Sequence, residues 1–180
     1  MSKIGRKPID IGAAKVEIKG QEIHFSGKNG SGVHTLPDVL EAKLDGKQLV
    51  LKAKNMSREA KRVWGLHRAL VANKLRGVQA NFEKLIQIEG LGFKAAVSGS
   101  KVVFTLGYSH KIDYELPKGV TLEVDKTGQN LTFKSADKEL VGHVCSLVKS
   151  LRPTEPYKGT GIKLSTDVTL RKVGKTKSSA

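Results

Sequence analysis

The stretch Asp45-Gly46-Lys47-Gln48-Leu49-Val50-Leu51-Lys52 decides the fold, because it carries a hairpin signal that the chain uses twice. Asp-Gly between two alternating apolar stretches is a strong short-range signal for a tight turn between antiparallel strands. Apolar residues alternate over 40–44 before this turn and over 49–53 after it. A period of two predicts two half-buried strands that the turn joins.

A similar pattern recurs about 80 residues further along the chain. The run Gly128-Gln129-Asn130-Leu131-Thr132-Phe133-Lys134 resembles the run from Lys47 to Lys52, and Leu116-Pro117 repeats Leu36-Pro37. Each half also ends in a helical pattern that closes with Leu-Arg. This repetition predicts a duplicated unit in which several antiparallel strands precede one helix that covers the sheet.

The spacing of apolar and capping residues predicts the individual elements. One helix is expected over 57–76, with Ser57 as its cap and Gly77 after its end. A second is expected over 136–151, with Ser135 as its cap. Alternation predicts strands at 16–18 and 23–25 in the first half, and at 85–88, 93–97, 102–106, 112–116, 120–124 and 131–134 in the second. The glycine-rich run 27–32 is interpreted as a turn.

We therefore predict an α+β fold of two similar domains from an internal duplication, each an antiparallel or mixed sheet covered by one helix. The domains comprise residues 1–82 and 83–151. Residues 152–180 are expected to form a basic C-terminal tail. A single mixed domain is the alternative that the residues leave open.

The net charge points to a polyanionic partner. The chain has 32 Lys and Arg against 17 Asp and Glu, a formal net charge of +15. A compact protein with this imbalance repels itself unless a partner neutralises it. No apolar run approaches the roughly 20 residues that span a bilayer, and the basic start lacks the apolar core of a signal peptide. We expect a cytoplasmic protein that binds nucleic acid, with no membrane partner and no small-molecule substrate.

The residue patterns that catalysis and metal binding need are missing from the sequence. Cys145 is the single cysteine, and the five histidines do not fall at metal-ligand spacing. Gly174-Lys175-Thr176 lacks the earlier glycine of a phosphate-binding loop, and Gly90-Leu91-Gly92 lacks the third glycine of a dinucleotide site. Ser109 and His110 are chain neighbours, a poor arrangement for a nucleophile and its base. The sequence predicts no enzyme, no metal and no cofactor.

The first candidate RNA contacts lie in the N-terminal half, which carries a charge of +9 over 1–82. At 100° per residue, basic side chains gather on the helix face opposite Trp64. We assign candidate RNA-binding roles here to Lys3, Arg6, Lys7, Arg62 and Arg68. A merely solvated basic face is the alternative.

The tail holds the second set, with a charge of +5 over 152–180 against +1 over 83–151. Pro153 and Pro156 impose an extended path. Glycines let a backbone approach phosphate or sugar closely, cations neutralise phosphates, and a tyrosine stacks on a base or packs on its own domain. The candidates are Arg152, Tyr157, Lys158, Gly159, Gly161, Lys163, Arg171, Lys172, Lys175 and Lys177. A disordered solubilising tail is the alternative.

Three motifs together resemble one known family. They are Ser2-Lys3-Ile4-Gly5-Arg6-Lys7-Pro8-Ile9, Leu106-Gly107-Tyr108-Ser109-His110, and the tail run from Arg152 through Glu155-Pro156-Tyr157-Lys158-Gly159 to Gly161-Ile162. In this order and spacing they are similar to bacterial large-subunit ribosomal protein six. Thr154 stands where that family commonly has proline, and Thr160 where it usually has lysine, so one phosphate contact is lost.

The resemblance implies two similar domains and a non-catalytic role in the ribosome. It implies binding to 23S ribosomal RNA, chiefly through the second domain and tail, near the elongation-factor binding region and the stalk base. Neighbouring large-subunit proteins are further implied partners. A free-standing nucleic-acid chaperone or histone-like protein is the alternative function, since it needs only the charge. An enzyme acting on an anionic substrate is a third, and it lacks a base or nucleophile pair.

Overall fold

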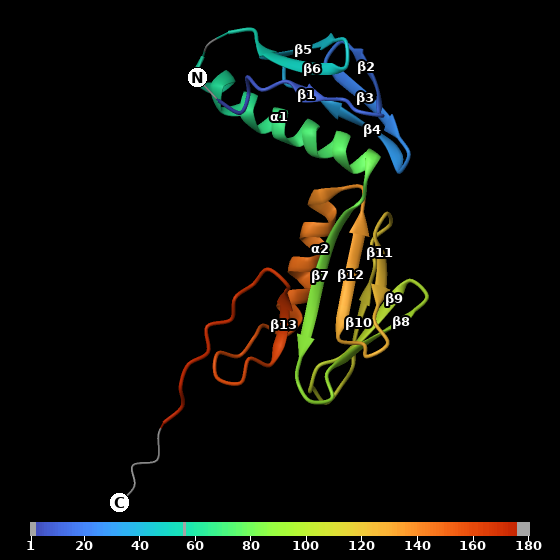
Figure 1. Ribbon diagram of the computed structural model, residues 1–180, viewed down its shortest axis with the longest axis vertical. Coiled ribbons are helices and arrows are strands. Elements are labelled where there is room, and N and C mark those ends of the chain that lie inside the picture. The colour runs from blue at the N-terminus through green and yellow to red at the C-terminus, as the bar shows by residue number, and fades with distance from the viewer. Residues whose placement is uncertain (1–2, 56, 176–180) are drawn as a thin grey trace, which may run out of the picture. The chain divides into compact units, whose positions relative to one another are not determined.

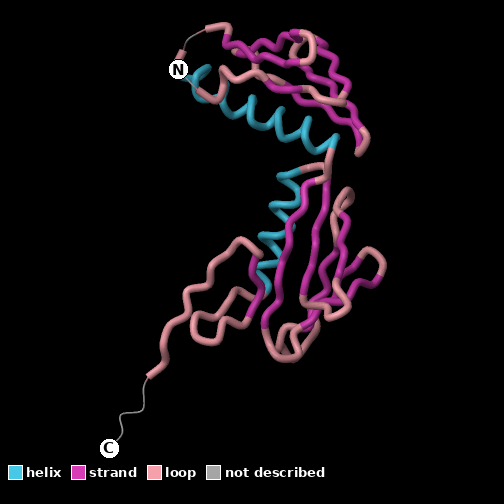
Figure 2. The backbone as a smooth tube through the Cα atoms, in the orientation of Figure 1, coloured by secondary structure: helices cyan, strands magenta, loops and turns pink. Residues whose placement is uncertain are grey.

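The computed structural model describes residues 3–55 and 57–175, which divide into two compact units (Figure 1). Unit 1 is formed by Met1–Phe82 with Ala136–Lys138, and unit 2 by Glu83–Ser135 with Glu139–Ala180. The predicted α+β class is confirmed: each unit combines a run of antiparallel strands with one helix (Figure 2).

Unit 1 contains two three-stranded sheets and one helix among its described residues. One sheet has the strand order β1-β6-β5 and the other β2-β3-β4. The helix α1 packs along β1, β3, β4 and β6, and its buried side chains join those of both sheets in one core. The elements are β1 (Ile9–Asp10), β2 (Lys15–Lys19), β3 (Glu22–Gly27), β4 (Gly30–Thr35), β5 (Leu40–Asp45), β6 (Gln48–Ala53) and α1 (Arg58–Gln79).

Unit 2 repeats this plan and adds one strand. One sheet has the order β10-β9-β8, and the other β11-β12-β7-β13. The apolar face of α2 joins both sheets in a single core that includes Cys145. The elements are β7 (Phe82–Glu89), β8 (Lys94–Ser98), β9 (Lys101–Thr105), β10 (Ile112–Glu115), β11 (Thr121–Val124), β12 (Asn130–Ser135), α2 (Lys138–Leu151) and β13 (Gly161–Leu164).

The duplication extends to individual hydrogen bonds. In unit 1 the Leu40 N–H donates to the Pro37 carbonyl at 2.9 Å. In unit 2 the Val120 N–H donates to the Pro117 carbonyl at 3.3 Å. The two Leu-Pro pairs of the sequence therefore mark the same turn, which leads into β5 in one unit and into β11 in the other. Strand order and turn geometry agree with the predicted internal duplication.

Four details differ from the sequence predictions. The run 27–32 is mostly strand: β3 extends to Gly27 and β4 begins at Gly30, which leaves two residues for the turn. Helix α1 continues through Gly77 to Gln79, because its last turn packs Val78 into the core. Ser135, predicted as the cap of the second helix, is instead the buried last residue of β12, and α2 begins three residues later. The short strand β1 was not predicted, since two residues show no period.

A fifth difference concerns the tail. We expected residues 152–180 to lie outside the domain, but Gly161–Leu164 pairs with Glu89–Ile86 as strand β13 of the unit 2 sheet. Ile162 is fully buried in the core. The strand has only two core-facing apolar residues, Ile162 and Leu164, and this is too little alternation for sequence reading to detect.

Two histidines and a lysine form a hydrogen-bonded chain in unit 1. Lys74 donates from Nζ to Nδ1 of His34 (3.2 Å), and Nε2 of His34 lies 3.0 Å from Nδ1 of His67. An ammonium group only donates, so His34 carries its proton on Nε2 and passes a hydrogen bond to His67. Burial, followed by the charge of Lys74 and the neighbouring His67, lowers the pKa of His34 to about 4.

This chain predicts acid sensitivity of unit 1. The pKa of His34 in the folded state lies below its ordinary 6.5. The unfolded state therefore binds more protons between these values, and stability falls as the pH drops from 6.5 to 4. The loss should reach about 2–3 kcal/mol. Urea unfolding followed by fluorescence of Trp64, the only tryptophan, measures it. His34→Gln should flatten the curve, and the exposed His143→Gln should not; equal curves for both would contradict this.

Candidate RNA-binding surface

Two features distinguish unit 2 from unit 1, and they meet at the C-terminal end of α2. Strands β9 and β10 are joined by the loop 106–111, whereas only Lys28 and Asn29 separate β3 from β4 in unit 1. The second addition is the segment after α2, which leads into β13. Duplicated units share what their fold requires, so the additions are where a function specific to unit 2 is expected.

Tyr108 links the two additions. Its hydroxyl donates a hydrogen bond to the Leu151 carbonyl at the end of α2 (3.1 Å). The Arg152 guanidinium lies 4.7 Å from the centre of the Tyr108 ring, within the range of a cation–π interaction. The His110 ring stacks on the same tyrosine, with the centroids 6.1 Å apart and the planes at 20°. Sequence reasoning named Arg152 but missed both rings as site residues, although the motif that contains them was recognised.

The segment after α2 is a closed loop. The Ile162 N–H donates to the Arg152 carbonyl (2.8 Å), and the Glu155 N–H donates to the Thr160 carbonyl (2.9 Å). The Thr160 hydroxyl also contacts the Glu155 carboxylate at 3.4 Å. Residues 152–162 are therefore held by their own hydrogen bonds and do not form a free extended tail.

The two candidate glycines make room for the chain itself. A Cβ on Gly161, which has φ +139°, would lie 2.7 Å from the Pro153 carbonyl oxygen. A Cβ on Gly159, at φ +74°, would lie 2.9 Å from Nε of Arg171. Both glycines are buried. We expected RNA to occupy this space, but the backbone of residue 153 and the Arg171 guanidinium occupy it.

Two of the candidate cations are engaged within unit 2. Lys163 forms an ion pair with Glu89 across the β13–β7 register and exposes 20% of its side chain. The Arg171 guanidinium lies 3.9 Å from the other oxygen of the same carboxylate. Glu89 thus offsets part of the positive charge of both residues, which weakens their expected role toward phosphate.

A further set of candidates stays exposed. The side chains of Lys158, Lys172 and Lys175 form no ion pair within residues 3–55 and 57–175. The Lys172 N–H donates to the Pro156 carbonyl (2.8 Å), which holds this stretch against the loop. Tyr157 exposes 55% of its surface. These residues form an exposed cationic surface with one aromatic ring; Lys177 lies outside the described residues.

In unit 1 the N-terminal candidates lie along α1. Arg68 donates from Nε to the Lys7 carbonyl (3.1 Å) and from an Nη to the Pro8 carbonyl (2.9 Å). Gly5 packs under the Trp64 ring. Arg68 therefore holds the N-terminal segment, and this engagement was not foreseen when Arg68 was assigned an RNA-binding role. The remaining candidates Lys3, Arg6, Lys7 and Arg62 are exposed.

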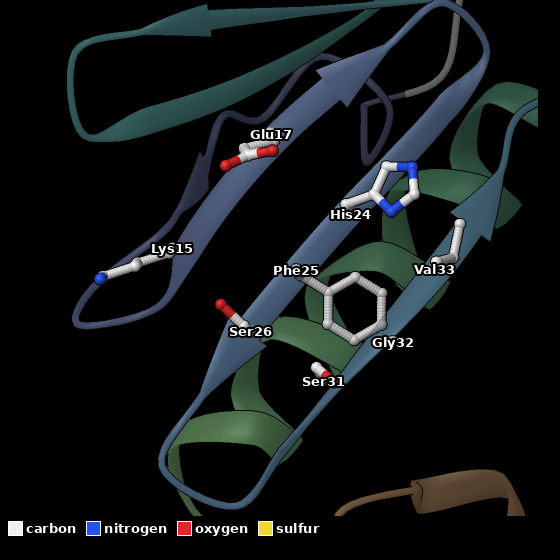
Figure 3. A pocket seen from close by; sticks show the side chains of 8 residues that line it. All are labelled: Lys15, Glu17, His24, Phe25, Ser26, Ser31, Gly32 and Val33. Atoms are coloured by element: carbon white, nitrogen blue, oxygen red, sulfur yellow. The ribbon is translucent and has the colours of Figure 1, made fainter.

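A hollow of about 280 Å³ lies on the outer face of the β2-β3-β4 sheet (Figure 3). Glu17 of β2 and His24 of β3 occupy opposite register positions there, and Val33 of β4 follows. His24 lies 3.2 Å from the Glu22 carboxylate. Because carboxylates border this hollow, it does not suit a polyanion, and the cationic surface of unit 2 is the better candidate.

Comparison with known proteins places the chain among ribosomal proteins. A family model described as ribosomal protein L6 matches residues 89–164. The chain is 40% identical over 185 residues to large ribosomal subunit protein uL6 of Myxococcus xanthus, with 98% of each chain covered. It is 41% identical over 177 residues to the protein of that name from Methylacidiphilum infernorum, again over 98% of each.

The chain belongs to the ribosomal protein L6 family. The resemblance found in the sequence is thereby confirmed. L6 proteins are structural ribosomal proteins, so the prediction that the chain is not an enzyme is confirmed as well. The stretch that matches the L6 model runs from the end of β7 to the end of β13, and it contains both additions of unit 2. No helix in the described part of the chain is long and apolar enough to cross a membrane.

Proposed function

We propose that the chain is a structural component of the large subunit of cytoplasmic ribosomes and binds 23S ribosomal RNA through unit 2. The contact surface comprises the loop 106–111 and the segment 152–175, near the elongation-factor binding region and the stalk base. Neighbouring large-subunit proteins are further partners. The observation that carries this proposal is the meeting of both additions of unit 2 at Tyr108 and Arg152.

The chemistry of this surface suits folded RNA. Exposed lysines neutralise phosphates, and that electrostatic contribution dominates the affinity. Unpaired bases of RNA loops stack on aromatic rings and on guanidinium planes. Tyr157 offers an exposed ring, and the stacked Tyr108 and His110 offer a second aromatic surface beside Arg152. Because internal hydrogen bonds already order the 152–162 loop, little ordering cost remains for binding.

A salt series tests whether this surface is a localised site. Each phosphate contact contributes about −0.9 to the slope of log affinity against log salt for duplex DNA, and about −0.7 for single strands. Lys158→Ala, Lys172→Ala and Lys175→Ala should each flatten the slope by somewhat less than one unit for a 23S RNA fragment. Lys163→Ala should change it less, because Glu89 already pairs with this lysine.

Two lysines of unit 2 outside the surface serve as controls. Lys101 is paired with Glu115 at 2.9 Å, and Lys126 lies in the β11–β12 turn. Lys101→Ala and Lys126→Ala should leave the slope nearly unchanged. A nucleic-acid chaperone bound through diffuse charge would respond alike to every lysine substitution. Identical slopes across the whole set would therefore favour the chaperone and exclude the localised site.

The exposed ring of Tyr157 gives a second test. Base stacking on an aromatic side chain contributes about 1–3 kcal/mol. Tyr157→Ala should therefore weaken binding to the RNA fragment by about five- to 160-fold, whereas Tyr157→Phe should keep most of it. Thermal unfolding should be unchanged in both variants, because the ring is more than half exposed. Wild-type affinity in Tyr157→Ala would remove this residue from the site.

A further inference from the structure

The edge strands of the two sheets of unit 2 lie next to each other. Strand β8 is the last strand of the β10-β9-β8 sheet, and β11 is the first of the β11-β12-β7-β13 sheet. The two edges approach each other, and a hollow of about 530 Å³ lies between them. We call this hollow the β8–β11 groove. It is lined by Lys94, Ala95, Ala96, Val97, Leu122, Val124, Asp125, Lys126, Thr127 and Gly128.

Main-chain groups of β8 face this groove. The Ala95 N–H donates to the Gly128 carbonyl (2.8 Å), so it points away from the partner strand β9. In an antiparallel strand, alternate residues direct their N–H and C=O to the same side. The N–H and C=O of Val97 therefore also point toward the groove, while those of Ala96 point to β9.

The same argument applies to β11. The Asp125 N–H donates to the Asn130 carbonyl (3.0 Å), so Asp125 faces β12. The main-chain groups of Val124 and Leu122 consequently face the groove. Two strand edges with available donors and acceptors thus border one hollow, an arrangement that pairs readily with another extended chain.

The side chains that line the groove indicate which residues a bound extended segment should carry. Val97 exposes 45% of its surface, and Leu122 and Val124 are half-buried, so the groove has apolar positions. Lys94 and Lys126 are exposed and form no ion pair within the described residues. The one carboxylate, Asp125, already accepts from the Lys126 N–H (2.8 Å) and the Thr127 hydroxyl (3.0 Å).

We propose that the β8–β11 groove binds an extended segment of a partner protein that alternates apolar and acidic residues. The segment adds a strand at the two edges, its apolar side chains contact Val97 and Leu122, and its carboxylates pair with Lys94 and Lys126. RNA phosphate would satisfy the two lysines only, since RNA has no donors and acceptors at strand spacing. The inference concerns a surface apart from the RNA site and does not depend on it.

The test uses the free full-length chain and three probes. The probes are a peptide of about ten alternating valines and glutamates, the same peptide with lysines in place of glutamates, and an oligouridine of about ten nucleotides. Backbone amide shifts of Val97, Leu122 and Val124 are followed by NMR during titration. The glutamate peptide should shift these three amides with saturation, and the other two probes should not.

Variants of the groove test its charge pairing and its main-chain hydrogen bonds separately. The double variant Lys94→Glu and Lys126→Glu should weaken the glutamate peptide at least about tenfold and make the lysine peptide the better ligand. Lys118→Glu, an exposed lysine outside the groove, is the matched control and should change neither. Val97→Pro removes a groove-facing N–H that the β8–β9 ladder does not use, and it should abolish peptide binding. Absence of shifts with the glutamate peptide, or shifts of these amides by oligouridine instead, would overturn the proposal.

Discussion

Truncation of the chain after Leu151 is expected to destabilise unit 2 strongly, whereas unit 1 should unfold as before. The cut removes β13, including Ile162, which is fully buried, and Leu164, which packs against the same core. Burial of such side chains contributes about 1.5–3 kcal/mol each, so the loss should exceed about 3 kcal/mol. For a domain of this size the melting temperature of unit 2 should fall by at least about 12 °C.

A matched truncation separates the strand from the charge. A chain that ends after Asp167 keeps β13 and the ion pair between Lys149 and Asp167 (2.7 Å), but it loses the cations from Arg171 onward. Its unit 2 should melt close to the full-length value while RNA binding weakens. All three tyrosines lie in unit 2 and the only tryptophan in unit 1, so near-ultraviolet signals report the units separately. Equal melting of both truncated chains would contradict the role given to β13.

Replacing Gly161 with valine is expected to have the second large effect. Its φ of +139° is unfavourable for any residue with a side chain, and a Cβ would lie 2.7 Å from both the Pro153 oxygen and the Thr154 Cα. Because these are backbone atoms, they cannot move aside cheaply. Strain and overlap together should lower the stability of unit 2 by about 3 kcal/mol or more. RNA binding should fall with it, and by more than in Lys158→Ala.

Gly174 provides the control for this substitution. It lies in the same segment, but a Cβ there meets no atom within 4 Å, and its φ is not positive. Gly174→Val should therefore unfold like the parent chain. Thermal unfolding of both variants, followed by tyrosine signals, distinguishes the cases. A Gly161→Val chain of normal stability with lost RNA binding would mean that RNA, and not the chain, fills the space beside this glycine.

Much of the fold follows from the sequence because its signals are local. The Asp45-Gly46 turn, the period-two stretches and the cap at Ser57 each depend on a few neighbouring residues. The repeated Leu-Pro pair also marked the two copies correctly. In both units the proline carbonyl accepts the hydrogen bond of an equivalent turn. These local signals predict most of the strands and the one helix of each unit.

The remaining features depend on partners far apart in the chain. The residues next to Lys163 in the sequence give no sign that it pairs with Glu89. Likewise, the residues next to Arg68 give no sign that it donates hydrogen bonds to the carbonyls of Lys7 and Pro8. Sequence reading therefore treated both cations as available to RNA. It also attributed Gly159 and Gly161 to an RNA approach, because a glycine signals close contact but not the identity of the contacting atoms.

The pairing of β13 with β7 has a consequence for the folding pathway. The hairpins β8–β9, β9–β10 and β11–β12 join neighbours in the chain, whereas Gly161 must find Glu89 across the whole of unit 2. Closing so long a loop is entropically costly, so this contact should form last. Until then β7 presents a bare strand edge with Ile86 and Ile88 beside it. A transient intermediate of unit 2 should therefore be prone to strand exchange between molecules, and unit 1 should refold faster and without it.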